Sequence, residues 1–199
     1  MDGHGAAFDF MLKTARSNSL DFIGKHLLDI ASRLHGKFYS LVRPDYAGVY
    51  RDCGIGIRGS DRIFPGPEAV GDHMHRFREL FMEYKEEFHP VVLAAFAHLQ
   101  LVLIHPYADG NGRTSRLLMN LVLVNQGYQI INFEPQTRNR YYSALKKSDR
   151  EGSGHSEFFT LLAELELEDQ DLYMKMIAFK PGGNATQAPG RGNPGQGPQ

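Results

Sequence analysis

The chain has 199 residues, 42% of them apolar and 23% charged, a composition that fits a single globular domain with a sizeable core. Its formal net charge of -1 gives no overall field that would attract nucleic acid or an anionic membrane, so neither is expected as a partner. The single cysteine, Cys53, excludes an intrachain disulfide and a cysteine-rich metal site and fits a reducing compartment.

The N-terminal sequence and the hydropathy pattern bear on location. Residues 1–20 lack the basic start and apolar stretch of a signal peptide. No apolar run approaches the ~20 residues that a membrane span needs. We therefore expect a cytoplasmic protein, and export as an effector through a route that reads another signal stays open.

The first half of the chain contains a predicted helix and a predicted flap. Apolar residues recur at helical spacing over residues 20–42, for example at Ile23, Leu27, Ile30 and Leu34. The segment after it, about 48–66, is punctuated by Gly and Pro and contains the one convincing strand alternation, around Ile55 and Ile57. It is predicted to form a short β-hairpin flap.

The second half is predicted to be helical. Pro67 begins one helix, 90–104 is apolar nearly all round, and 113–127 is a second largely apolar helix closed by Gly127. Two amphipathic helices follow, over 137–152 and 156–179. The sequence therefore predicts a mostly α fold: a compact domain over 1–180, with a motif loop at 105–116 between two buried helices. Residues 181–199, rich in Gly, Pro, Asn and Gln, are predicted to be a disordered tail.

The loop between the two apolar helices, "HPYADGNGRTSR", has the composition of an anion site. Gly110, Asn111 and Gly112 can adopt open backbone conformations that turn successive N–H groups into one concavity. The following helix adds its free N–H groups and its dipole. Arg113 and Arg116 share one face of that helix and can both reach a phosphate. Phosphate is the expected occupant.

Two more loop residues supply chemistry to such a site. Asp109 can hold Mg²⁺, which takes one or two carboxylates together with substrate phosphates. His105 precedes Pro106, which opens the chain, and an imidazole suits proton removal from a hydroxyl. Each residue also has an ordinary structural interpretation: a Gly-Asn-Gly turn, a capping His, a turn-forming Asp, arginines on a solvated face. The joint pattern favours phosphoryl or nucleotidyl transfer.

The loop resembles the motif of the Fic family, H-P-F-x-[D/E]-G-N-G-R-x-x-R, at every fixed position except that Tyr107 replaces Phe. The similarity extends over about residues 20–178, through "LAAFAHLQLVLI", "LLMN", "QTRNRYYSALKKS" and the flap "AGVYRDCGIGIRG". These stretches look like the animal and related bacterial Fic AMP-transferases. The resemblance implies a Fic fold and AMP transfer from ATP to a Ser, Thr or Tyr hydroxyl of a target protein, with release of pyrophosphate.

The resemblance also implies roles for the motif residues. His105 would be the general base, and Asp109 would hold Mg²⁺ bridging the ATP phosphates. The anion hole around the α- and β-phosphates would be formed by Gly110, Asn111 and Gly112, with Asn111 also fixing the α-phosphate. Arg113 would stabilise the phosphates, and Arg116 would hold the γ-phosphate.

Residues outside the motif also match the family. Tyr141 and Tyr142 match a Tyr pair near the adenine and ribose, with core packing as the alternative. Asn120 matches a position close to the nucleotide, or is an ordinary helix asparagine. Ile57, Arg58 and Gly59 lie in the flap, which in the family pins the target's segment beside the active site by strand-like pairing.

The chain departs from the family in one regulatory feature. Many Fic proteins block the γ-phosphate site with a helix of pattern [S/T]-x-x-x-E-[G/N], whose Glu pairs with the second motif arginine. The first glutamate here is Glu68, so none is expected from the N-terminal segment. "TLLAEL" (160–165) is a weak match. We expect restraint by a separate antitoxin-like partner, with constitutive activity or a longer parent chain as alternatives, and we expect little removal of AMP.

Several alternatives stay open. UMP or GMP donors are compatible with the motif, while Gly112 argues against phosphate transfer because it keeps room for the β-phosphate. A catalytically silent binding module is disfavoured, because the His, Asn and Arg positions are all intact. Several Fic proteins form homodimers, but no apolar stripe in the sequence requires one.

Overall fold

The computed structural model describes residues 3–57, 62–148 and 155–178; the predicted tail at 181–199 lies outside this range. The described residues are mostly helical, in agreement with the predicted fold class. In chain order the elements are α1 (Gly3–Ser17), α2 (Leu20–Lys25), α3 (Leu27–Tyr39), η1 (Pro44–Tyr46), η2 (Pro67–Ala69), α4 (Val70–Tyr84), α5 (Pro90–Ile104), α6 (Asn111–Asn125), α7 (Arg138–Ser148) and α8 (His155–Ala178).

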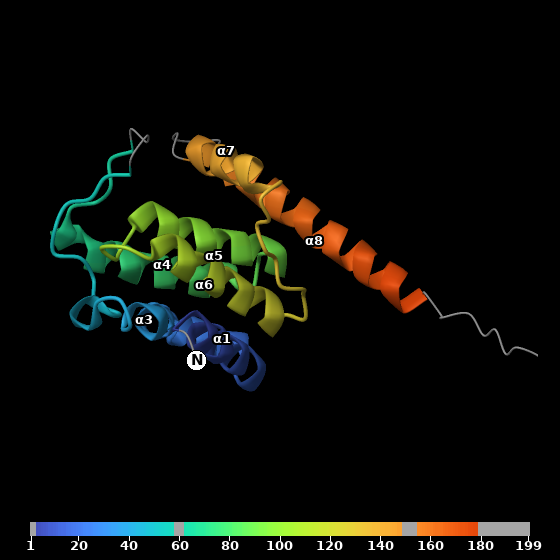
Figure 1. Cartoon of the computed structure of the whole chain (residues 1–199), viewed down its shortest axis with the longest axis horizontal. Coiled ribbons are helices and arrows are strands. Elements are labelled where there is room, and N and C mark those ends of the chain that lie inside the picture. Colours follow the sequence, from blue (N-terminus) through green and yellow to red (C-terminus); the bar gives the residue numbers. More distant parts are fainter. Residues whose placement is uncertain (1–2, 58–61, 149–154, 179–199) are drawn as a thin grey trace, which may run out of the picture.

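Helices α5 and α6 lie in the middle of the molecule, with α1 and α3 on one side and α7 and α8 on the other (Figure 1). α5 is buried along most of its length because it is apolar nearly all round, as predicted for 90–104. α6 begins two residues before the predicted 113 and is followed by Gly127 at φ 83°. The loop 105–110 is therefore held between the two most buried helices.

The predicted helix over 20–42 is divided into two. α2 begins after Ser19, whose side chain accepts the N–H of Phe22 at 3.2 Å, and it ends at His26, which leaves helical geometry at φ -104° and ψ 17°. α3 then ends at Tyr39, before the predicted boundary. Hydrophobic periodicity predicted the buried face correctly but not the break, because the apolar spacing continues across it.

The sequence interpretation missed the first helix, α1. It buries Ala7, Met11 and Ala15 against α3 and α6. These residues follow helical spacing, but two of the three are alanines, which give a weak apolar signal. α1 forms one wall beside the arginine-bearing helix α6.

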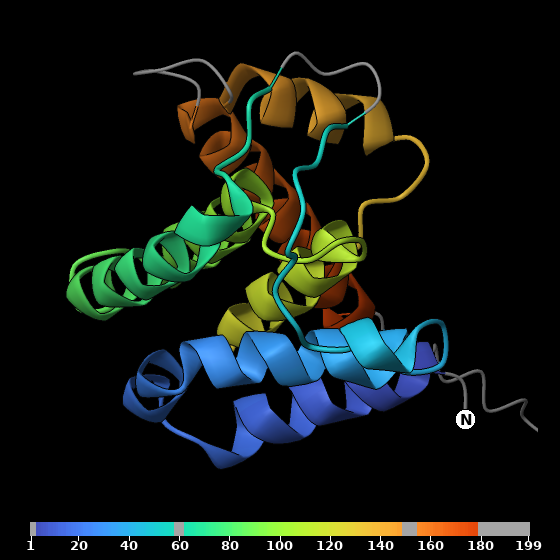
Figure 2. The same ribbon diagram turned by 90° about the vertical axis from the view of Figure 1, so that its left-hand side faces the viewer.

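The predicted strand pairing is not seen in the described part of the flap. Among its described residues, 48–57 and 62–66, none is in a strand. Figure 2 shows two extended arms crossing the face of the molecule between α3 and α7. A hydrogen bond from the Arg51 side chain to the carbonyl of Pro65 joins the two arms, and a second, to the carbonyl of Cys53, stays within the first arm. Ile57 is half exposed, whereas Arg58 and Gly59 lie outside the described residues.

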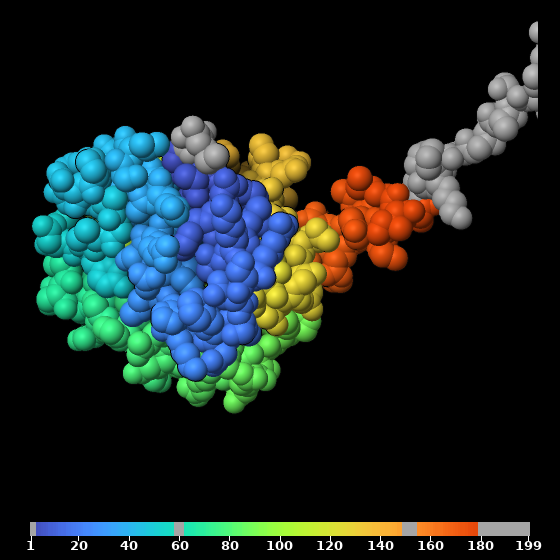
Figure 3. Space-filling view, turned by 90° about the horizontal axis from the view of Figure 1, so that it is seen from below, coloured from blue at the N-terminus to red at the C-terminus, as the bar shows by residue number. Residues whose placement is uncertain are grey.

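The last turns of α8 project from the body (Figure 3). Their exposed apolar side chains are Leu167, Leu172, Tyr173, Met174, Met176 and Ile177. Whether the chain forms a homodimer stays a prediction. In the ranges that the structure covers, no helix is both long and apolar enough to cross a membrane.

His98, on α5, is fully buried between α7 and α8. Its Nε2 lies 3.2 Å from the hydroxyl of Tyr141, and its ring stacks on Phe158 with centroids 4.7 Å apart. Burial, reinforced by the charge of Arg116, lowers the pKa of His98 from 6.5 to about 3. The folded protein therefore keeps this histidine neutral, while the unfolded chain protonates it near pH 6.5.

We predict that His98 makes the fold sensitive to acid. Its folded pKa is depressed, so the stabilisation is complete above pH 6.5 and is lost as the pH falls toward 3. The loss amounts to about 1.4 kcal/mol per pH unit. Urea unfolding of wild type and His98→Gln between pH 7.5 and 4.5 should show a shallower decline for the variant. Equal slopes would contradict the prediction.

Candidate active site

His105 ends α5 in a left-handed backbone conformation, with φ 54° and ψ 59°. Among the described residues it is the one non-glycine residue with positive φ. Its N–H donates to the carbonyl of Leu101 at 2.9 Å, and Pro106 has no N–H with which to continue the helix. Such a conformation costs about 1–3 kcal/mol for a non-glycine residue, so neighbouring groups must hold it.

The imidazole of His105 presents Nε2 as an acceptor. Nδ1 lies 3.2 Å from the carbonyl oxygen of Val102, and because a carbonyl only accepts, Nδ1 carries the ring hydrogen. Burial lowers the pKa of His105, and the charges of Arg51 and Arg62 act in the same direction; the bond to Val102 and the charge of Asp109 oppose them. The ring is neutral at neutral pH, and Nε2 can take a proton.

The N-terminus of α6 forms an anion cradle. Gly110 precedes the helix at φ 81° and ψ 1°, and the N–H groups of Asn111 and Gly112 have no acceptor among the described residues. A Cβ placed on Gly112 would meet only Nη1 of Arg116, at 3.4 Å. Open space therefore adjoins two N–H groups and a guanidinium at the positive end of a helix, which fits a phosphate.

The side chain of Asn111 closes the motif loop. It is buried, its Oδ1 accepts the N–H of Tyr107 at 2.9 Å, and its Nδ2 donates to the carbonyl of Tyr107 at 2.7 Å. The backbone N–H of Asn111 is left to face the cradle. A contact between its side chain and the α-phosphate stays a prediction.

His35 is a site residue that the sequence interpretation missed. Its Nδ1 accepts the N–H of Gly48 at 2.8 Å, so its Nε2–H donates to the carbonyl of Asp109 at 3.0 Å. Its ring stacks on Tyr107 with centroids 4.0 Å apart. His35 thus joins the start of the flap to the motif loop. It lies on the apolar face of α3, where the pattern alone suggests only core packing.

Asp109 is the candidate Mg²⁺ ligand and lies at the open side of the loop. One of its oxygens is 3.2 Å from Nη2 of Arg113, and its side chain is 64% exposed. The described residues contain no group of three His, Cys, Asp or Glu side chains that could hold a metal. One carboxylate beside a phosphate cradle fits Mg²⁺, which keeps several waters and takes its other ligands from phosphates.

Arg116 separates two hollows. One, of about 440 Å³, is lined by His4, Gly5, Phe8, Arg113, Arg116, Leu117, Asn120, Ile131 and Asn132. The other, of about 200 Å³, is lined by Arg116, Asn132, Phe133, Arg138, Tyr141 and Tyr142. The two hollows share Arg116 and Asn132, so the structure brings both motif arginines, Asn120 and the Tyr pair to adjoining hollows next to the start of α6.

The members of the Tyr pair differ in burial. Tyr141 is buried with its hydroxyl against His98, and burial raises its pKa although Arg116 lies close enough to oppose the shift. Tyr142 is largely exposed at the rim of the smaller hollow. Asn120 uses its amide on the N–H and carbonyl of Ile131, at 2.9 and 3.0 Å. The predicted nucleotide contacts of all three stay predictions.

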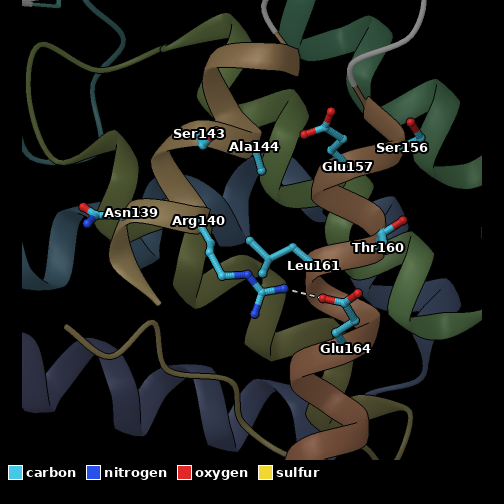
Figure 4. A pocket seen from close by; sticks show the side chains of 9 residues that line it. All are labelled: Asn139, Arg140, Ser143, Ala144, Ser156, Glu157, Thr160, Leu161 and Glu164. Carbon is cyan, nitrogen blue, oxygen red and sulfur yellow. Dashed lines mark hydrogen bonds and ion pairs between the residues drawn. The ribbon is translucent and has the colours of Figure 1, made fainter. Parts of the chain in front are cut away.

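The TLLAEL segment lies on α8, away from the motif arginines. Figure 4 shows Thr160 and Glu164 in a groove between α7 and α8, where the carboxylate of Glu164 pairs with Arg140. Among the described residues no carboxylate forms an ion pair with Arg116. Glu164 therefore does not act as an inhibitory glutamate in this conformation.

We predict that Glu164→Ala leaves the activity of the site unchanged, within about twofold. The Arg140–Glu164 pair is half exposed, so its loss should cost no more than about 1 kcal/mol of stability. Initial rates of nucleotide transfer and thermal unfolding of the two proteins test this. A tenfold rise in rate would show that this segment restrains the site.

These features define a helical protein with an anion cradle at the start of a buried helix and a neutral histidine in the loop that leads to it. A family model described as Fic/DOC family matches residues 21–123. The chain belongs to this family, as the sequence motif predicted.

Known proteins are similar to this chain in sequence or in fold. The protein adenylyltransferase Fic of Drosophila yakuba is 37% identical over 167 residues, which are 83% of this chain and 33% of the relative. That of Drosophila willistoni is 39% identical over 142 residues, 71% of this chain and 28% of the relative. The structure of Fic-1 from C. elegans matches with a TM-score of 0.71 and 26% identity, covering 86% of this chain and 50% of that chain. The chain thus spans about a third of the length of the curated relatives it matches.

Proposed function

We propose that the chain transfers AMP from ATP to a Ser, Thr or Tyr hydroxyl of a target protein and releases pyrophosphate. The observation that carries the proposal is the state of His105: its Nδ1–H donates to the carbonyl of Val102, and its Nε2 has no hydrogen-bond partner among the described residues, in the loop that leads into the α6 cradle. The Drosophila relatives, named as protein adenylyltransferases, support the same reaction.

In the proposed reaction, Nε2 of His105 removes the proton from the target hydroxyl. The hydroxyl oxygen attacks the α-phosphorus, the bond to the β-phosphate oxygen breaks, and pyrophosphate leaves with the electron pair. The N–H groups of Asn111 and Gly112 stabilise the negative charge on the α- and β-phosphates, and Arg113 and Arg116 hold the remaining charge. Mg²⁺ held by Asp109 would neutralise phosphate charge.

The proposal assigns the target to the flap. Half-exposed Ile57 offers an apolar contact next to an extended backbone, which suits pairing with a target segment. It also assigns restraint of the enzyme to a separate antitoxin-like protein that reaches Arg116. Support comes from the lack of a carboxylate on Arg116 among the described residues and from the open hollow beside it.

The test is to incubate the purified chain with Mg²⁺, a cell lysate and ATP labelled at either the α- or the γ-phosphate. A lysate without the chain is the control, because kinases in the lysate transfer the γ-phosphate themselves. Label from α-³²P-ATP that appears only when the chain is added is expected. Label from γ-³²P-ATP that depends on the added chain, with none from α-³²P-ATP, would show phosphate transfer and overturn the proposal. Label only from UTP or GTP would keep the mechanism and change the donor. No label from any nucleotide would favour a binding module.

We predict that the chain removes AMP at less than about a hundredth of the rate at which it adds it. Removal requires a carboxylate that positions a water at the AMP phosphorus, and the described residues place no carboxylate against Arg116. The measurement follows release of AMP from a target modified beforehand, after ATP has been removed. Release as fast as transfer would contradict this prediction.

A further inference from the structure

Arg51 is a buried arginine, 3% exposed, at the start of the flap. Its Nε–H donates to the carbonyl of His105 at 2.8 Å, Nη1 donates to the carbonyl of Cys53 at 2.9 Å, and Nη2 donates to that of Pro65 at 2.5 Å. Its backbone N–H donates to the carbonyl of Pro106 at 2.9 Å. Every one of these acceptors is a main-chain oxygen.

The bonds of Arg51 reach the point where the backbone is most strained. The left-handed turn at His105 directs its carbonyl away from the axis of α5, so the oxygen needs a donor from elsewhere. The Nε–H of Arg51 is that donor, and the backbone N–H of Arg51 donates to the next carbonyl, that of Pro106. Bonds from a charged donor are stronger than those between neutral groups, and a buried guanidinium needs several acceptors. The guanidinium of Arg51 therefore stabilises the backbone turn at His105, and the carbonyls of that turn and of the flap stabilise the buried guanidinium.

We propose that Arg51 is the positioning residue of the base: it holds His105 in the left-handed conformation and ties both arms of the flap to the same point. The proposal rests on the proposed function, in which His105 Nε2 removes the proton. Because Cys53 belongs to one arm and Pro65 to the other, one guanidinium fixes the position of both arms of the flap relative to the backbone of His105. A target bound along the flap then reaches Nε2 at a fixed distance.

Arg51 also acts on His105 through its charge, and the two effects can be separated. Three charged groups act on the imidazole: Arg51, Arg62 on the second arm of the flap, and Asp109 in the motif loop. Arg62 donates to the carbonyl of Leu103 at 3.1 Å and is not bonded to the carbonyl of His105. Arg62→Gln therefore removes a positive charge that acts on His105 while the bond from Arg51 to the carbonyl of His105 stays in place.

The test compares kcat, the KM for ATP and the pH profile of wild type with three variants. Arg51→Lys keeps the charge but loses the planar fork, so kcat should fall about 10- to 100-fold with an unchanged KM for ATP and an unchanged acid limb. Arg51→Gln should show the same fall and an acid limb moved to higher pH, because losing a positive charge raises the pKa of His105. Arg62→Gln should also move the limb to higher pH, and its kcat should fall less than that of Arg51→Lys because the bonds of Arg51 remain.

A folded Arg51→Lys protein with the kcat of wild type would overturn the inference. A second readout needs no activity: deuterium exchange of 47–57 and 103–110 should accelerate together in Arg51→Lys. If wild type transfers no nucleotide but both segments loosen in the variant, the proposed function fails and the positioning role stands. If Arg51→Lys does not fold, the amides of Arg51 and His105 in wild type should show equal opening free energies, and unequal values overturn the inference.

Discussion

Replacement of His105 by alanine is expected to lower kcat on the order of 10³-fold, within the range found for positioned general bases. The affinity for ATP should stay within about twofold, because the phosphate contacts come from the start of α6 and from the arginines. The backbone at 105 also matters: histidine adopts the left-handed conformation more often than most residues do, so alanine adds some backbone strain there, which thermal unfolding of the variant measures.

Initial rates of AMP transfer together with calorimetric ATP binding test this expectation. His75→Ala, which removes an exposed histidine on α4, is the matched control and should behave as wild type. Loss of both transfer and ATP binding in His105→Ala would mean that the histidine holds the loop rather than the proton. A residual rate within tenfold of wild type would remove it from the role of base.

Alanine substitutions at two glycines of the motif are expected to have opposite effects: one should lower stability and the other should lower activity. Gly110→Ala should lower the free energy of unfolding by about 1–3 kcal/mol, because φ is 81° and the new Cβ would lie 2.9 Å from the ring of Phe38. Gly112→Ala should leave stability unchanged or raise it by up to about 1 kcal/mol, since alanine favours a helix. It should nonetheless reduce AMP transfer about 10²-fold, because the methyl group enters the cradle beside Arg116.

Thermal unfolding and ATP titration of both variants separate the two effects. Gly112→Leu extends the test, since a larger side chain should abolish ATP binding while the protein remains folded. Wild-type ATP affinity in Gly112→Ala would show that the phosphates do not lie at the N-terminus of α6. Unchanged stability in Gly110→Ala would show that Phe38 and the loop relax around the methyl group at little cost.

Much of the helical architecture was predictable because it depends on local pattern. The all-apolar stretch that became α5 and the start and stop signals around α6 gave their positions to within two residues. α1 was missed because small residues bury a face without a strong apolar signal. The flap was expected to be a hairpin from alternation around Ile55 and Ile57, but none of its described residues is in a strand, and a side-chain bond from Arg51 to Pro65 joins its two arms.

The candidate site divides in a similar way. Motif residues from His105 to Arg116 were found from sequence because they are adjacent in the chain. His35, Arg51 and His98 were not, because each contributes through a partner more than 40 residues away: Asp109, His105 and Tyr141. Such pairings depend on how helices pack, and spacing along one segment carries no information about them.

The hydrogen bonds that shape the motif loop have a consequence for how this sequence can diverge. The side-chain hydrogen bonds of Asn111, His35 and Arg51 that join the described residues of the loop and flap all go to main-chain atoms. A residue that offers only its carbonyl can change identity without changing that carbonyl. We therefore expect Cys53 and Pro65 to tolerate substitution, because only their carbonyls take part in the network. The flap sequence, and with it the proposed target preference, could then change while Asn111, His35 and Arg51 keep the motif loop in the same conformation.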